Sequence, residues 1–69
     1  PMNTVADLLE DPNRIVLIRR TLIAGQVGYR VVVNSLCCGK VIAETEAATL
    51  AAAVEKAAAK LEDYKANVQ

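Results

Sequence analysis

Histidine, phenylalanine and tryptophan are absent from this chain of 69 residues, which has only two tyrosines and two cysteines. Without histidine, the chain lacks the side chain that most often acts as a general acid or base near neutral pH. Two cysteines alone offer few ligands for a metal, and no phosphate-binding loop is present in the sequence. We therefore predict a protein that is not an enzyme, with no catalytic residues, no cofactor and no bound metal.

A charge of one sign is also missing, because eight acidic and eight basic residues cancel to a net charge of zero. Proteins that bind nucleic acids generally carry a basic excess, and those that bind single strands also expose aromatic rings. No apolar run approaches the ~20 residues of a membrane span. The sequence therefore disfavours a nucleic-acid partner, and we expect no membrane partner.

The two cysteines are adjacent, at Cys37 and Cys38. Adjacent thiols have poor geometry for chelating one metal, and a disulfide between them would close a strained ring. Three functional interpretations stay open: a metal site, a redox pair and an intermolecular disulfide. We favour two reduced thiols in a turn, which is typical of a cytoplasmic protein.

The apolar residues leave little material for a core. Of the 37 residues that make up the hydrophobic 54% of the chain, 12 are Ala and 20 are Val, Ile or Leu. Ordering 69 residues costs on the order of 100 kcal/mol, and chains of this size often gain burial by oligomerising. We expect a single domain over residues 1–69 that forms a homodimer, with Pro1 left by tag cleavage and Met2 as the native start.

Hydrophobic patterning predicts three strands in the middle of the chain. Residues 14–24 are rich in β-branched and aliphatic side chains, residues 25–28 break the run, and residues 29–34 resume it. A second turn at residues 37–40 leads into a short strand at residues 41–44. The first two strands are expected to form a hairpin, with the third as its neighbour.

A helix is predicted on each side of these strands. Asn3 or Thr4 can cap a short helix that Pro12 ends, and Asp7 stands three residues after Thr4, the spacing of a capping box. Thr45 is expected to cap a long Ala-rich helix with one apolar stripe, made of Ala47, Leu50, Val54, Ala57, Leu61, Tyr64 and Val68. The prediction is an α+β fold of order αβββα: a three-stranded antiparallel sheet, a long C-terminal helix on one face and a short N-terminal helix.

The hairpin divides the strand residues between two faces in the same way whether its turn has two or four residues. The core face is expected to carry Val16, Ile18, Arg20, Leu22, Tyr29, Val31, Val33 and Ser35. We expect Arg20 there either to extend to an edge of the sheet or to pair with a helix carboxylate such as Glu55 or Glu62, and substitution of Arg20 by Glu to lower the melting temperature.

The opposite face is about half aliphatic, whereas a solvated sheet face should be mainly polar. Arginine among exposed aliphatic residues is typical of interface centres. The alternative is an ordinary solvated surface carrying two arginines. We predict a protein-binding face of Leu17, Arg19, Thr21, Arg30, Val32, Asn34 and Leu36, on which Arg30→Glu abolishes association and leaves the fold intact.

Two resemblances involve the second half of the chain. The stretch Tyr29-x-Val31-x-Val33, then Gly39-Lys40-Val41, then the Ala-rich helix, resembles a double-stranded-RNA-binding domain, which implies the same element order. That family has lysines at the start of its last helix, where this chain has residues 46–49, Glu-Ala-Ala-Thr. The stretch is also similar in size and style to small phage-encoded anti-defence proteins, including some anti-CRISPR proteins.

The second resemblance implies a stoichiometric inhibitor that occupies a surface of a host defence protein, acting in the host cytoplasm. Together with the half-apolar face, it favours a non-enzymatic, self-associating protein-binding module. The alternative is a nucleic-acid-binding domain related to the double-stranded-RNA-binding fold.

Overall fold

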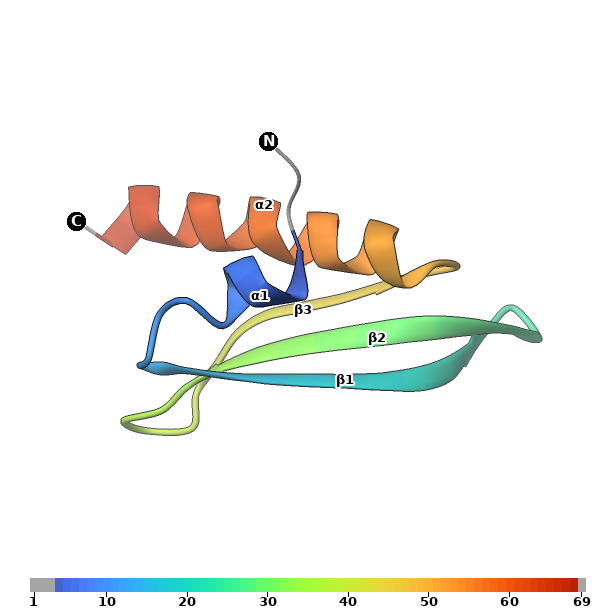
Figure 1. Cartoon of the computed structure of the whole chain (residues 1–69), viewed down its shortest axis with the longest axis horizontal. Coiled ribbons are helices and arrows are strands. Elements are labelled where there is room, and N and C mark those ends of the chain that lie inside the picture. The colour runs from blue at the N-terminus through green and yellow to red at the C-terminus, as the bar shows by residue number, and fades with distance from the viewer. Residues whose placement is uncertain (1–3, 69) are drawn as a thin grey trace.

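The computed structural model describes residues 4–68 of the chain, so the interpretation of Pro1 and Met2 lies outside the described residues. The elements in order are α1 (Val5–Leu8), β1 (Arg14–Ile23), β2 (Gln26–Ser35), β3 (Val41–Ala47) and α2 (Leu50–Val68). The strands form one antiparallel sheet in the order β1-β2-β3, and α2 lies along one face of it (Figure 1). The predicted α+β fold and its αβββα order are confirmed.

The hairpin turn has two residues and begins one residue earlier in the chain than predicted. Ala24 and Gly25 both have positive φ, 52° and 81°, as a two-residue type I′ turn requires. β2 therefore begins at Gln26, and the predicted turn over residues 25–28 is wrong. Gly28 belongs to the strand, where a Cβ would lie 2.8 Å from the backbone oxygen of Ala47. Glycine is needed there because another backbone comes close.

The third strand is also longer than predicted, and Thr45 is part of it. The Thr45 side chain is buried and its Oγ1 donates a hydrogen bond of 2.9 Å to the backbone oxygen of Ala53 in α2. Thr49 makes the capping contact instead, because its Oγ1 accepts from the backbone N–H of Ala52 at 3.2 Å. The predicted helix cap at Thr45 is therefore wrong, and Thr45 instead ties β3 to the helix.

The core lies between α2 and the two strands beneath it. Val31 and Val33 of β2 are fully buried, together with Val54 of α2. The other buried apolar residues are Leu8, Ala43, Ala47, Ala53, Ala57 and Leu61. The predicted stripe of α2 thus faces the sheet, although Ala47 belongs to β3 and the Val68 side chain lies outside the described residues.

α2 leaves β1 largely uncovered. In Figure 1 the helix runs closest to β3 and farthest from β1. Val16 packs against the core cluster, but Ile18 is 37% exposed and Leu22 is 70% exposed. Their placement on the core side of the sheet was predicted, but their burial was not observed. The register shows why, since Ile18 lies opposite the buried Val31 but one strand farther from the helix.

Arg20 is exposed on the same side of β1. It forms no ion pair with Glu55, Glu62 or any other carboxylate in the part of the chain that the structure describes. The expected pairing with the helix is therefore not found. α2 packs on β2 and β3, so the helix does not extend over the strand that carries Arg20.

α1 closes the other end of the core. Thr4 and Asp7 form the predicted capping box, in which the Thr4 backbone N–H donates to Asp7 Oδ2 at 2.9 Å. Leu8 is buried against the core, whereas Leu9 is exposed. The turn that follows is stabilised by Asp11, whose Oδ1 accepts from the backbone N–H of Asn13 at 2.9 Å. This turn delivers the chain to the start of β1.

No helix within residues 4–68 is long and apolar enough to pass through a membrane.

Candidate protein interface on the outer sheet face

The outer face, which is the sheet face opposite α2, carries six of the seven predicted interface residues on β1 and β2. Two rows cross it from strand to strand, with Leu17 beside Val32 and Arg19 beside Arg30. Thr21 lies opposite Gly28 and Asn34 lies opposite Ile15. Leu36, the seventh residue, follows β2 and is exposed in the turn before β3.

β3 extends both rows with carboxylates that the sequence reasoning missed. Arg30 lies opposite Glu46, and Val32 lies opposite Glu44. Because the strand was predicted to end at Glu44, its alternating pattern was not followed to Glu46. That alternation, Glu44-Thr45-Glu46 with the carboxylates on one face, was the available signal.

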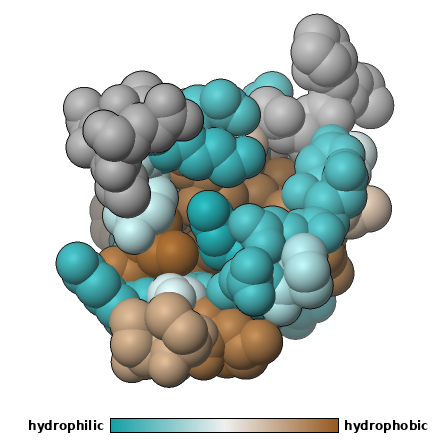
Figure 2. All heavy atoms as spheres, turned by 90° about the vertical axis from the view of Figure 1, so that its left-hand side faces the viewer, coloured by the Kyte–Doolittle hydropathy of each residue, from teal (hydrophilic) through white to brown (hydrophobic). Residues whose placement is uncertain are grey.

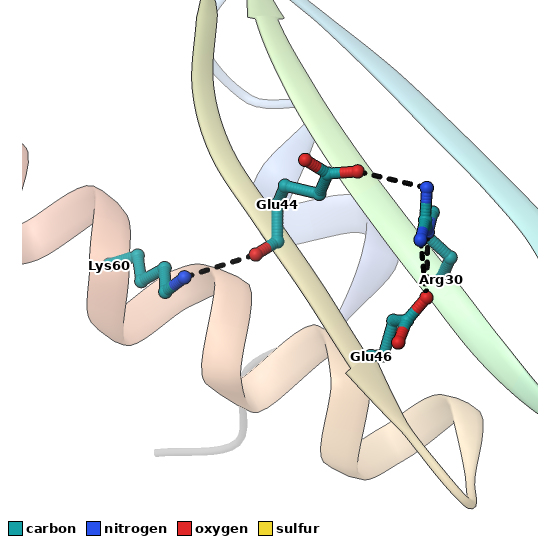
Figure 3. Close-up of polar contacts among 4 residues, drawn as sticks. All are labelled: Arg30, Glu44, Glu46 and Lys60. Atoms are coloured by element: carbon teal, nitrogen blue, oxygen red, sulfur yellow. Dashed lines mark hydrogen bonds and ion pairs between the residues drawn. The ribbon is translucent and has the colours of Figure 1, made fainter. Parts of the chain in front are cut away.

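Arg30 binds both carboxylates (Figure 3). Its Nε and Nη2 donate to Glu46 Oε2 at 2.8 and 2.6 Å, and its Nη1 lies 3.0 Å from Glu44 Oε2. The hydrogen bond to Glu46 and then the charges of both carboxylates raise the pKa of Arg30 above its ordinary value. The Arg30 guanidinium is thus paired within the chain, which makes it a poor anchor for a partner's carboxylate.

Arg19 differs from its neighbour Arg30. It is exposed on the outer face and makes no ion pair within the part of the chain that the structure describes. The cation that this face presents to a partner is therefore Arg19. Arg30 and its two carboxylates line a shallow hollow of ≈ 290 Å³ beside it, in which every charged side chain is already paired.

Aliphatic side chains continue the outer face toward the turn between β2 and β3. Leu17 is 53% exposed and Leu36 is 55% exposed, and Ile15 and Val41 are also exposed although neither was among the predicted residues. Figure 2 looks onto this end of the molecule and shows apolar surface along the bottom of the view. The face therefore combines an aliphatic stretch with one available cation.

Asn34 marks a bulge on this face. The pairing between β2 and β3 shifts between Val33 and Asn34. The Asn34 Oδ1 atom is enclosed, and no hydrogen-bond donor reaches it within the described chain. The Asn34 Oδ1 atom therefore contributes little to binding a partner, because a partner's donor cannot reach an atom that is out of contact with solvent.

The two cysteines lie in the turn after β2, as predicted, and both are exposed and unbridged. Cys37 Sγ is 3.1 Å from Ser35 Oγ. A hydrogen bond from the Lys40 backbone, followed by hydrogen bonds from Cys37 and Ser35, lowers the pKa of Cys38. Within residues 4–68 no three potential metal-ligating side chains come together.

Comparison with protein-family models, with curated proteins and with solved structures gave no match to this chain.

Proposed function

We propose that this chain is a small, non-enzymatic protein-binding module that docks on another protein through the outer sheet face. The observation that carries the proposal is the exposed Leu17 beside Val32, with Ile15 next to them, on a sheet face that α2 does not cover. Sheet faces in contact with water are normally mainly polar. Aliphatic residues bordered by an available arginine have the composition of an interface core.

The partner's chemistry follows from the charges on this face. Arg30 is occupied by Glu44 and Glu46, so these three groups together present a net negative charge. Arg19 is the available cation beside the aliphatic residues. A fitting partner therefore offers an apolar patch with a carboxylate placed to meet Arg19. An inhibitor that occupies a host protein's surface, the role implied by the phage-protein resemblance, requires no more than such a face.

Affinity capture from a lysate of the cells in which the chain acts, followed by mass spectrometry, tests this proposal. The wild type is compared with Arg19→Glu and Leu17→Asp, and with Lys65→Glu as the control. Lys65 is exposed on α2, so Lys65→Glu makes the same charge change as Arg19→Glu away from the outer face.

A protein retained by the wild type and by Lys65→Glu, but lost with both outer-face variants, supports the proposal. Its affinity for Arg19→Glu should fall at least ~10-fold, because a like charge in an interface costs several kcal/mol. If every retained protein binds all four forms equally, the outer face is not the binding site.

Nucleic acid is the competing ligand class, and we expect only weak, sequence-independent binding to it. The net charge is zero, and the structure pairs Arg30 with carboxylates. Duplex RNA or DNA should bind no tighter than ~10⁻⁴–10⁻⁶ M at physiological salt. A nanomolar complex in a gel-shift assay, resistant to salt, would favour the nucleic-acid alternative.

A further inference from the structure

We propose that the free edge of β1 pairs with β1 of a second copy, antiparallel about a two-fold axis, to form a continuous six-stranded sheet. β1 has β2 as its only neighbour in the described sheet. Exposed edges of this kind are usually blunted by shortness, charged side chains, proline or a bulge, and of these features β1 has only its arginines. β1 has ten residues, contains no proline and keeps an unbroken register with β2 from Arg14 to Ile23.

Both faces of β1 are apolar enough to contribute to such an interface. Ile15 and Leu17 are exposed on the outer face, and Ile18 and Leu22 are exposed on the side that α2 fails to cover. A strand added at this edge would shield aliphatic groups on both sides of the sheet while its backbone satisfies the unpaired N–H and C=O groups of β1.

The sequence of β1 favours one register. Two copies that share a continuous sheet face must pair residues of the same parity. With Ile18 on the two-fold axis, residues 14–22 all pair, Leu17 lies opposite Arg19 of the second copy, and no two arginines are directly opposed. Moving the axis by one residue sets Arg19 against itself or Arg14 against Arg20, and like charges directly opposite are destabilising.

The charged residues of β1 and of the segment before it favour a second copy of this chain as the partner at the β1 edge. β1 contains three arginines and no acidic residue, while residues 7–11, the end of α1 and the turn after it, contain three acidic residues and no basic one. Asp11 lies 3.6 Å from Arg14 of its own chain and Asp7 caps α1, so Glu10 is the acidic residue that this segment offers to Arg20 of a second copy. α1 lies on the α2 side of the sheet, and its turn leads to the start of β1 (Figure 1). Antiparallel pairing brings this acidic segment of one copy toward Arg20 of the other, on the same side of the sheet.

The same antiparallel pairing of the two β1 strands would also cover exposed apolar side chains. Leu9, at the end of α1, is exposed, as are Ile18 and Leu22 in the second half of β1. Because the strands run in opposite directions, the first half of one β1 lies beside the second half of the other. The end of α1 and its turn from each copy therefore come near the part of the other copy's β1 that its own α2 leaves open.

Multi-angle light scattering at ~100 μM gives the first test. The wild type should have twice the 7.4 kDa mass of one chain. Ile18→Lys should halve that mass, because it opposes two ammonium groups at the axis, whereas Val41→Lys, at an exposed position on β3, should remain dimeric. Circular dichroism checks that each variant is folded. If Ile18→Lys is unfolded, Arg20→Glu takes its place, because it should also yield the monomer.

Arg20→Glu combined with Glu10→Arg should restore the dimer by exchanging the two charges. A wild type of 7.4 kDa, or a dimer that Val41→Lys disrupts and Ile18→Lys does not, would overturn the proposal.

Disulfide cross-linking tests the register itself. In a background with Cys37→Ser and Cys38→Ser, Ile18→Cys should give a covalent dimer on non-reducing gels after mild oxidation, because the axis sets residue 18 opposite itself. Leu22→Cys is the matched control, since it lies opposite Arg14 and its two copies would be about 27 Å apart, at ~3.4 Å per residue. Cross-linking through Leu22→Cys but not Ile18→Cys would refute the register.

This inference stands apart from the proposed function. Loss of the dimer with Ile18→Lys tests only the pairing of the β1 edges. Loss of a partner with Leu17→Asp, in a chain that remains dimeric, tests only binding through the outer face.

Discussion

The two edges of the sheet are built in opposite ways. β3 is seven residues long, carries the bulge at its start and has Glu44 and Glu46 on its outer face. Two lysines of α2 donate hydrogen bonds to backbone carbonyl oxygens of β3. Lys56 Nζ lies 3.2 Å from the backbone oxygen of Glu46, and Lys60 Nζ lies 3.0 Å from the backbone oxygen of Glu44 (Figure 3). β1 is longer and regular, and no helix covers it.

The difference follows from where one helix of 19 residues can lie. Thr45 and the two lysines bind α2 to β3, and the helix stripe then packs on β3 and β2. β1 falls outside the width of the helix. In a chain this small, one helix protects the β3 edge and covers β2 and β3 on one face. The β1 edge is then where further apolar surface can be buried.

The largest difference between β2 and β1 should appear in the free energy of unfolding lost when an aliphatic side chain on the α2 side of each strand is shortened. Val31 is fully buried in β2, so Val31→Ala should lower the free energy of unfolding by about 2 kcal/mol. Leu22→Ala, at an exposed position on the α2 side of β1, should cost under ~0.5 kcal/mol when the chain is monomeric. Urea titration near 1 μM measures both, and equal losses would mean that β1 is covered like β2.

Charge reversal on the outer face should give the next largest effect. Arg30→Glu places a third carboxylate beside Glu44 and Glu46 and removes both ion pairs between β2 and β3, so the melting temperature should fall. Arg19→Glu should leave the melting temperature nearly unchanged, because Arg19 makes no ion pair in the described chain.

This reverses the sequence-based expectation that Arg30→Glu leaves the fold intact. Thermal melts followed by circular dichroism check both variants. Matching melting temperatures for Arg30→Glu and the wild type would show that the ion pairs do not hold β3 in place.

Opening the protected edge should give the smallest change in stability but a visible change in assembly. Removing both lysine contacts, with Lys56→Met and Lys60→Met together, should cost about 0.5–1 kcal/mol, as expected for exposed hydrogen bonds. The chain would then have two open edges, so species larger than a dimer should appear in sedimentation velocity. Lys65→Met is the control, and a double variant that remains strictly dimeric would show that the lysines do not protect β3.

Much of the fold could be predicted because its local signals agree. The division of β1 and β2 into two faces depends only on the parity of the hairpin, so it survived the misplaced turn at Gly28. The cap of α1 was correct because Thr4 and Asp7 stand at the spacing of a capping box. These features depend on residues close in sequence.

The errors concern contacts between distant residues. Thr45 has the sequence signal of a helix cap, but its hydroxyl bonds to Ala53, eight residues away, from inside a strand. The shorter predicted strand then concealed the pairing of Arg30 with Glu46. A sequence pattern shows which side chains share a face but does not show how many strands one helix will cover, so the exposure of Ile18 and Leu22 was missed.

The openness of β1 is best tested by following backbone amide resonances while the chain is diluted from ~500 μM to ~5 μM. Changes should be confined to residues 14–22 and the acidic segment 7–11, while the amides of β3 from Glu44 to Ala47 stay constant. Spectra that do not change with concentration, or changes centred on Arg30, Val32 and Val41, would contradict an open edge at β1 and a closed edge at β3.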